Sequence, residues 1–355
     1  MEVLVYEFFS SGGSCQWSQR EQNASLLTEG AAMVAAVAND LARLENVHPV
    51  VMLDRRLDQF AGVGLHQGCQ LTWVDSARTE QQTFDRLAAA ADWTILVAPE
   101  WDDILLSRAN RCLALGGRLL GPGPELIELA ADKVALADYF RQHGLPVPAG
   151  CPLDRGDSLP ESFQYPAILK PRFGAGSAGL QWIEDPADKV AWDPRFSQYR
   201  LEEYCPGTAV SVVILMGPGG SHVLPACRQL LSEDQTFQYR GGSLPIADSL
   251  AKRAEHLAER AADVLPDALG YLGLDIVLGE EESADFIIEV NPRLTTSYVG
   301  LSQLSEDNFA GMMLRVAQGE SCVPRFQGQQ VCFTASGSLV DNRPSFRSKT
   351  VVLEG

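Results

Sequence analysis

The first third of the chain alternates short, almost wholly apolar runs with longer stretches in which apolar residues recur every three or four positions. The first pattern is typical of buried strands and the second of amphipathic helices. The expected elements, in chain order, are a strand at 3–8, a helix at 26–44, a strand at 48–53, a helix around 84–91, a strand at 93–98 and a helix at 104–115. Strands that alternate with helices predict an α/β fold, in which a parallel sheet carries helices on both faces.

A turn-forming stretch at 121–124 separates this module from a single helix expected at 125–142, which ends before Gly144 and Pro146. Lys133 lies within that helix. One lysine on an amphipathic helix is usually solvated, so this residue alone indicates no site.

An apolar strand expected at 165–171 ends in Lys170, and the loop after it, 172–179, contains three glycines and Ser177. Glycines allow backbone N–H groups to approach phosphate oxygens closely, and the lysine would supply positive charge. The loop is not a Walker loop, because the lysine precedes the glycines and no Gly-Lys-Ser/Thr triplet is present. We interpret it as a phosphate-binding loop, with an ordinary hairpin turn as the alternative.

The stretch 286–293 brings Glu289 and Asn291 to the end of an expected buried strand. Side chains two positions apart in a strand project from the same face. Two oxygen donors on one face suit Mg²⁺. The alternative is a strand with a solvated glutamate and a turn at Asn291-Pro292.

Length and composition limit the interpretation. A chain of 355 residues, 46% of them hydrophobic, can bury a sizeable core and exceeds one average domain, so two or three subdomains are expected. The formal net charge of −18 argues against general binding of nucleic acid or of anionic membranes. No apolar run approaches the roughly 18 residues of a membrane-spanning helix, and the N-terminus begins with an acid and a strand, so we expect a cytoplasmic protein.

Two further patterns argue against other chemistry. The eight cysteines are scattered without a Cys-x-x-Cys pair, which predicts reduced thiols, and the five histidines show no metal-ligand spacing. The loop at Gly12-Gly13 follows the first strand but lacks the G-x-G-x-x-G spacing of a dinucleotide site, so a dehydrogenase is not favoured. A loop at the carboxyl end of a strand still suits contacts with a substrate.

Taken in order, several features resemble the ATP-grasp superfamily of carboxylate–amine ligases. They are Lys133, Lys170 with its Gly/Ser loop, the stretch 202–205, Asp275, and Glu289 with Asn291. The resemblance covers essentially the whole chain, and it implies an ATP-grasp fold behind an N-terminal βαβ pre-ATP-grasp module. The implied cofactors are ATP and Mg²⁺, or Mn²⁺ in its place. The implied domains are a pre-ATP-grasp domain at 1–122, a central subdomain at 123–200, a C-terminal subdomain at 201–340 and a tail at 341–355.

The same resemblance implies roles for single residues. Lys133 and Lys170 would hold the α- and β-phosphates, while Gly176 and Ser177 would close over the β- and γ-phosphates. The residues that would line the adenine are Glu202, Glu203, Tyr204 and Cys205, and those that would hold the metal are Asp275, Glu289 and Asn291. Ala209 stands where many relatives place a ribose-binding glutamate, so the ribose contact is unassigned.

A narrower resemblance is to the tyramine–glutamate ligase branch, which is associated with methanofuran-type one-carbon cofactors, and to its bacterial relatives. The stretches that carry it are 6–8 with the Ser/Gly loop that follows, 26–30, Arg228-Gln229, 239–242 and 291–297.

Arginines and hydroxyls complete the implied site. On a strand expected at 223–231, Arg228 has the position from which ATP-grasp enzymes aim a catalytic cation at the γ-phosphate and acyl phosphate. Arg293 is the second catalytic candidate, and Arg240 and Arg293 could bind a substrate carboxylate bidentately. Glu7 could pair with a protonated amine. The hydroxyl candidates near the acyl group are Thr295, Thr296 and Ser297. Taken singly, each arginine is more often a surface residue and Glu7 a solvated acid.

The function implied is ATP-dependent amide formation through an acyl phosphate, with glutamate and tyramine or a similar aromatic amine, tyrosine included, as substrates. The expected partners are therefore a small-molecule acid and amine, with no nucleic acid and no membrane; a homo-oligomer is compatible with this. The alternative is a non-catalytic ATP-binding regulatory protein on the same fold, against which the retained lysines and magnesium ligands argue.

Overall fold

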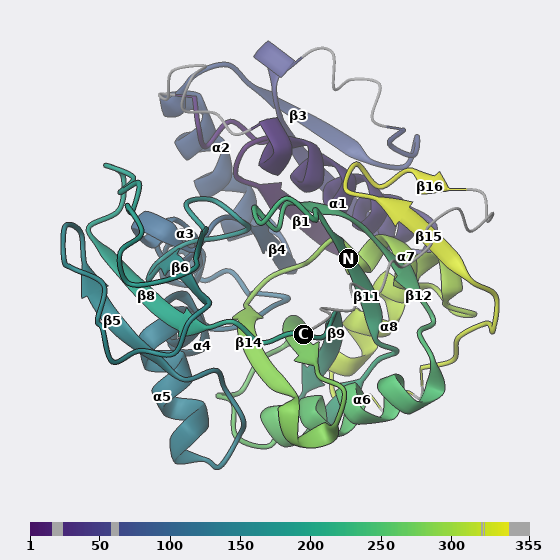
Figure 1. The fold of residues 1–355 in the computed structure, drawn as a ribbon. Helices are drawn as coiled ribbons and strands as arrows, with labels where there is room; N and C mark the ends of the chain where they lie inside the picture. Colours follow the sequence, from purple (N-terminus) through teal and green to yellow (C-terminus); the bar gives the residue numbers. More distant parts are fainter. Residues whose placement is uncertain (16–23, 58–63, 321, 323, 341–355) are drawn as a thin grey trace.

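The computed structural model describes residues 1–15, 24–57, 64–320, 322 and 324–340. The predicted tail at 341–355 lies outside these residues. Figure 1 shows three sheets: β1 to β4 near the N-terminus, β5 to β8 in teal, and a large sheet in green and yellow that begins at β9. No helix in the described ranges is long and apolar enough to cross a bilayer. All eight cysteines are free thiols, as predicted.

The N-terminal sheet is parallel throughout, with strand order β3-β2-β1-β4. Its strands are β1 (Glu2–Glu7), β2 (His48–Asp54), β3 (Gln70–Val74) and β4 (Trp93–Val97). Helix α1 (Ala24–Ala42) packs on one face, and α2 (Ala77–Ala90) and α3 (Ile104–Ala114) pack on the other. The predicted α/β arrangement is confirmed. Sequence reasoning missed β3, because most of this edge strand is exposed or half-buried and it lacks a fully apolar run.

The second sheet is small and antiparallel, with order β5-β8-β6-β7. Its strands are β5 (Gly150–Asp154), β6 (Ala167–Pro171), β7 (Gln181–Ile183) and β8 (Gln198–Glu203). Its core is built on buried side chains such as Leu169, Tyr199 and Leu201. Because β8 pairs with both β5 and β6 along its length, this sheet continues to Glu203, past the boundary predicted at 200/201.

The prediction of a single helix at 125–142 is wrong. The chain forms two helices, α4 (Pro124–Ala131) and α5 (Lys133–Gln142), with a break at Asp132. Asp132 has an extended backbone, and its carboxylate caps α5 by accepting hydrogen bonds from two backbone N–H groups. The same carboxylate accepts from Arg172 at 2.8 and 2.6 Å. Lys133 therefore becomes the first residue of α5, with a side chain only 8% exposed. Both helices pack against the C-terminal sheet and not against the central one.

The C-terminal sheet is antiparallel, with order β14-β13-β9-β11-β12-β15-β16, and β10 pairs with β9. Its strands are β9 (Thr208–Gly217), β10 (Gly220–Val223), β11 (Cys227–Leu231), β12 (Tyr239–Leu244), β13 (Gly270–Leu278), β14 (Phe286–Asn291), β15 (Val331–Thr334) and β16 (Leu339–Val340). The one strand predicted at 223–231 is thus two, because Pro225 offers no N–H for a continuous ladder.

Helices cover both faces of this sheet around β9 and β13. Helix α6 (Asp248–Ala262) packs on one face, and α7 (Ser297–Leu304) and α8 (Phe309–Ala317) pack on the other. Short 3₁₀ helices lie at Trp101–Asp103 and Glu282–Ala284.

Helix α1 joins the N-terminal and C-terminal units into one hydrophobic core, because it packs against β1 and β2 and also against α7 and α8. The buried carboxylate of Asp40 on α1 accepts hydrogen bonds from Tyr298 at 2.9 Å and Ser302 at 2.6 Å. These hydrogen bonds connect α1 of the N-terminal unit to α7 of the C-terminal unit.

Candidate active site

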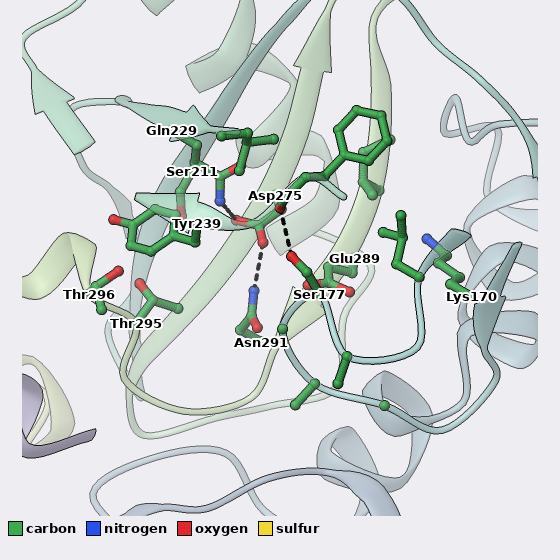
Figure 2. A pocket seen from close by; sticks show the side chains of 18 of the residues that line it. Lys170, Ser177, Ser211, Gln229, Tyr239, Asp275, Glu289, Asn291, Thr295 and Thr296 are labelled. Carbon is green, nitrogen blue, oxygen red and sulfur yellow. Dashed lines mark hydrogen bonds between the residues drawn. The ribbon is translucent and has the colours of Figure 1, made fainter. Parts of the chain in front are cut away.

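A cavity of about 280 Å³ lies where the three sheets meet. Its walls come from the ends of β1 and β4, helix α1, the glycine loop after β6, the β8–β9 linker, and strands β9, β11, β13 and β14. Figure 2 shows Asp275, Glu289 and Asn291 on neighbouring strands, with Ser177 and Lys170 to one side and Tyr239, Thr295 and Thr296 to the other.

The fold brings most of the predicted residues into this one cavity. Those that line it are Glu7, Lys133, Lys170, Gly176, Ser177, Glu202, Glu203, Tyr204, Cys205, Asp275, Glu289, Asn291, Arg293, Thr295, Thr296 and Ser297. Ala209 also lines it, with no side-chain group that could bind a ribose hydroxyl. These residues come from the N-terminal, central and C-terminal sheets and the segments that follow their strands.

Arg228 and Arg240 do not line the cavity, contrary to the prediction. Both are exposed, and the neighbours that line the cavity are Gln229 on β11 and Tyr239 on β12. Successive side chains of a strand point to opposite faces, so placing Gln229 inside turns Arg228 outside. Cys227, which is buried, and Leu231, which lines the cavity, lie on the same face of β11 as Gln229. This alternation of apolar residues could have shown from the sequence that Arg228 faces the other way.

Lys170 is buried near the end of β6. Its side chain is 6% exposed and its Nζ lies 2.6 Å from Glu202 Oε1. Strand β8 runs antiparallel to β6, so Glu202 is aligned close to Lys170 and also accepts from Arg200 Nε at 3.0 Å. The Glu202 carboxylate is thus engaged by two cations rather than free for an adenine.

Lys133 is neutralised in the same way. Its Nζ lies 3.2 Å from Glu289 Oε2 and donates a hydrogen bond to the carbonyl of Gly174 at 2.8 Å. One ammonium group therefore touches both the glycine loop and a predicted metal ligand. An anionic ligand that binds either lysine must compete with the carboxylate already paired with that lysine, Glu289 for Lys133 and Glu202 for Lys170.

The glycine loop lines the cavity and contacts the turn between β11 and β12. Gly176 has a φ of +61°, which glycine adopts readily, and Ser177 Oγ donates to the carbonyl of Phe237 at 2.6 Å. Phe237 belongs to a cluster of rings with Trp182 and Tyr204, in which the Trp182 and Tyr204 centroids are 4.6 Å apart. The loop after β6 is thus held against the turn between β11 and β12. Phe237 was not predicted.

Asp275, Glu289 and Asn291 form the group predicted to hold a metal. Asp275 and Glu289 are paired in register across β13 and β14, and Asn291 Nδ2 and Gln229 Nε2 each donate to the Asp275 carboxylate at 3.0 Å. Burial and the charge of Glu289 raise the pKa of Asp275 to about 7. Burial alone would raise the pKa of Glu289, but the Lys133 and Lys170 ammonium groups outweigh it and lower that pKa.

The donor set fits a hard divalent cation. Two half-buried carboxylates are paired across adjacent strands, and their mutual repulsion is one cause of the raised pKa of Asp275. A cation bound between them would remove that repulsion, and carboxylate and amide oxygens are the ligands that Mg²⁺ accepts together with waters and phosphates.

Arg293 lines the cavity, but its guanidinium is already occupied. Its Nε lies 2.8 Å from Glu100 Oε1 across the interface between the C-terminal and N-terminal units. Nη1 donates to the carbonyl of Leu294 at 3.2 Å. The predicted convergence of three arginines is therefore reduced to one, whose charge is largely balanced by Glu100.

Glu7 closes the N-terminal end of the cavity. It is 2% exposed, and its carboxylate accepts hydrogen bonds from the backbone N–H groups of Phe9 at 3.1 Å and Ser10 at 2.7 Å. Gly30 of α1 packs directly on this carboxylate, since a Cβ at that position would lie 2.5 Å from the carboxyl carbon. Glu29, the residue before it, also lines the cavity and was not assigned a role from the sequence.

The pH dependence of stability tests the environment of Glu7. Burial raises its pKa from the ordinary value of 4.5 to about 7. Between these values the folded protein keeps a proton that the unfolded chain releases, so rising pH favours unfolding. We expect the free energy of unfolding of the wild type, relative to Glu7→Gln, to fall by up to about 3 kcal/mol from pH 4.5 to 7. Denaturant titrations of both proteins measure this; a difference that is constant with pH would contradict it.

Comparisons with known proteins agree with this architecture. Residues 47–127 match the family described as "pre ATP-grasp 3 domain" and residues 130–297 match "ATP-grasp domain". The tyramine–L-glutamate ligase of Methanocaldococcus fervens is 21% identical over 340 residues, which cover 92% of this chain and 98% of that protein. A D-alanine–D-alanine ligase of Bordetella pertussis is 26% identical over 261 residues, covering 67% of this chain and 81% of that one.

Solved structures show the same fold. An ATP-grasp superfamily protein from Archaeoglobus fulgidus superposes with a TM-score of 0.67 at 20% identity, over 94% of this chain and 92% of that one. The two domain matches, the order of the motifs and the three-sheet architecture lead to one conclusion. The chain belongs to the ATP-grasp superfamily and carries a pre-ATP-grasp domain ahead of its ATP-grasp domain.

Proposed function

We propose that the cavity catalyses ATP-dependent ligation of a carboxylate to an amine. A substrate carboxylate oxygen attacks the γ-phosphorus, the bond to the β-phosphate oxygen breaks, and ADP leaves. The amine nitrogen then attacks the acyl carbon of the acyl phosphate, phosphate leaves with the C–O bond electrons, and the nitrogen loses a proton to give the amide. The observation that carries this proposal is the pair of buried lysines, Lys133 and Lys170, facing the Asp275–Glu289 carboxylates beside a glycine loop.

Different residues of the cavity would bind the phosphates, the metal and the adenine. Lys133 and Lys170 would bind phosphate oxygens, and the backbone around Gly176 would close over them. Asp275, Glu289 and Asn291 would hold Mg²⁺, which supplies positive charge against the phosphate oxygens. The polypeptide between β8 and β9, with Tyr204, would line the adenine.

The cavity does not favour a covalent acyl–enzyme route. Its one cysteine among the described lining residues is Cys205, and burial raises the pKa of that thiol to about 12. A thiol that stays protonated at neutral pH is a poor nucleophile. An acyl phosphate needs no protein nucleophile, and so it fits these residues better.

For the substrates, we propose glutamate and tyramine or a similar aromatic amine. Support for glutamate now comes from the M. fervens relative, which is named for that acid and amine, and from the hydroxyls of Thr296 and Ser297 in the cavity. The arginines give less support, because of Arg228, Arg240 and Arg293 only Arg293 lines the cavity. Support for the amine comes from the carboxylates Glu7 and Glu29, which line the same cavity and could pair with an ammonium group.

A trapping experiment tests the reaction class. With ATP, Mg²⁺ and glutamate, hydroxylamine should intercept the acyl phosphate, so that glutamyl hydroxamate forms in step with ADP. Tyramine should replace hydroxylamine and give the amide instead. ADP release that does not depend on any acid would contradict ligation, and ATP binding without ADP release under all conditions would favour the non-catalytic regulatory alternative.

A further inference from the structure

We infer that Arg200, a buried arginine of β8, is a positioning residue for the nucleotide: it holds the Glu202 carboxylate, so that the Lys170 ammonium is free to bind a phosphate. This inference rests on the proposed ligase function and adds a residue that acts through Glu202 and Lys170. It is carried by the alternation of side chains along β8, by the two ion pairs of Glu202 and by the space that Gly150 leaves.

The alternation of β8 places three charged side chains on one face of the central sheet. Tyr199 and Leu201 are buried in the core of that sheet, so Arg200 and Glu202 project from the opposite face. Lys170 on β6 is paired in register with Arg200, and residues paired across two strands share a face. This face therefore carries two cations and one carboxylate.

Each oxygen of the Glu202 carboxylate has a cation of its own. Oε1 lies 2.6 Å from Lys170 Nζ, and Oε2 accepts a hydrogen bond from Arg200 Nε at 3.0 Å. The side chain of Arg200 is 3% exposed, and those of Lys170 and Glu202 are each 6% exposed. In the part of the chain that the structure describes, Lys170 and Glu202 line the cavity and Arg200 does not. Arg200 thus balances the charge of Glu202 from outside the cavity wall.

The guanidinium of Arg200 is fixed in this position. Its Nη2 donates a hydrogen bond to the carbonyl of Pro148 at 2.9 Å. Gly150 on β5 leaves room for it, because a Cβ there would lie 2.8 Å from both Cζ and Nη2 of Arg200. A guanidinium keeps its charge at all relevant pH values and offers several N–H donors in one plane. Arg200 can therefore stay bound to Glu202 while Lys170 takes another partner.

The second cation changes what Lys170 can do. If Lys170 were the single partner of Glu202, a phosphate that drew the ammonium away would leave a buried carboxylate unpaired, which is costly. With Arg200 in place, that carboxylate remains paired. Two cations and one carboxylate also leave one positive charge on these side chains, which favours a charge-assisted hydrogen bond from Lys170 to a phosphate oxygen.

A double-mutant cycle on ATP binding tests this inference. Calorimetric titration with ATP and Mg²⁺, below the unfolding transition of each protein, compares the wild type, Arg200→Gln, Glu202→Gln and the double variant. Arg200→Gln should weaken ATP binding by roughly tenfold. In the Glu202→Gln background the same change should alter ATP affinity by less than about twofold, because no carboxylate remains to compete for Lys170. Arg195→Gln, at an exposed arginine in the same subdomain, is the matched control and should bind ATP as the wild type does.

This comparison distinguishes positioning from a purely structural role. A structural arginine would lower the melting temperature without making the loss of ATP affinity depend on Glu202. An equal loss of affinity in both backgrounds, or an unchanged affinity in folded Arg200→Gln, would overturn the inference. If Arg200→Gln unfolds at the assay temperature, Arg200→Lys takes its place: it keeps the charge and should bind ATP within about threefold of the wild type. A tenfold loss in that variant would also overturn the inference.

The outcomes also separate this inference from the proposed function. Hydroxamate formation from glutamate by the wild type would stand as evidence for a ligase even if ATP affinity does not depend on Arg200. Conversely, a loss of ATP affinity in Arg200→Gln that disappears in the Glu202→Gln background would support the role of Arg200 even in a protein that never releases ADP, and in that case the ligase would be refuted.

Discussion

Replacing Glu289 with glutamine is expected to lower the rate of Mg²⁺-dependent ADP formation by about a thousandfold, because one of the two carboxylates that are paired across β13 and β14 loses its charge. The substitution is nearly isosteric. It removes the ion pair to Lys133 but also the repulsion that Glu289 exerts on Asp275. These effects oppose each other in the folded protein, so the melting temperature should change little.

The measurement is a coupled ADP assay across a range of Mg²⁺ concentrations, together with thermal unfolding. Glu281→Gln, at an exposed position before β14, is the matched control and should keep wild-type rates. Since three oxygen donors bind Mg²⁺ weakly without phosphates, the wild type should show no tight Mg²⁺ binding in the absence of nucleotide. Micromolar Mg²⁺ binding without ATP, or near-normal turnover in Glu289→Gln, would refute this assignment.

Replacing Lys170 with alanine is expected to lower the free energy of unfolding by about 3 kcal/mol, as well as to weaken ATP binding by roughly tenfold or more. The lysine side chain is 6% exposed and bound to an equally buried Glu202. Removing it leaves that carboxylate with Arg200 as its one charged partner among the described residues. The loss therefore lies at the lower end of what breaking a buried ion pair costs.

Chemical denaturation and calorimetric titration of ATP give the two quantities separately. Lys189→Ala, an exposed lysine in the same subdomain, should change neither. If Lys170→Ala unfolds at the same denaturant concentration as the wild type, the buried ion pair contributes nothing to stability. If it binds ATP normally below its unfolding transition, Lys170 is a structural residue and not a phosphate ligand.

Much of the fold was accessible from local patterns. Apolar runs alternating with amphipathic stretches are enough to predict a parallel sheet, because each pattern reports which residues one element buries. The order of Lys133, Lys170, Asp275 and Glu289 along the chain predicted one site, and the fold brings these residues into one cavity. The elements were predicted from residue spacing and the shared site from the resemblance to the ATP-grasp superfamily, and both can be read from the sequence.

The tertiary structure decided the rest, because spacing shows which side chains share a face but not what that face meets. Gln229 and not Arg228 faces the cavity, because the face of β11 that carries Gln229 is the one packed toward the cavity in the folded protein. Asp132 breaks a helix because Arg172, 40 residues away, binds its carboxylate. Glu29 faces the same space as Glu7 only because α1 packs across the end of β1. The role of each of these charged side chains depends on partners that are distant in sequence, and only the packing of the folded chain brings those partners together.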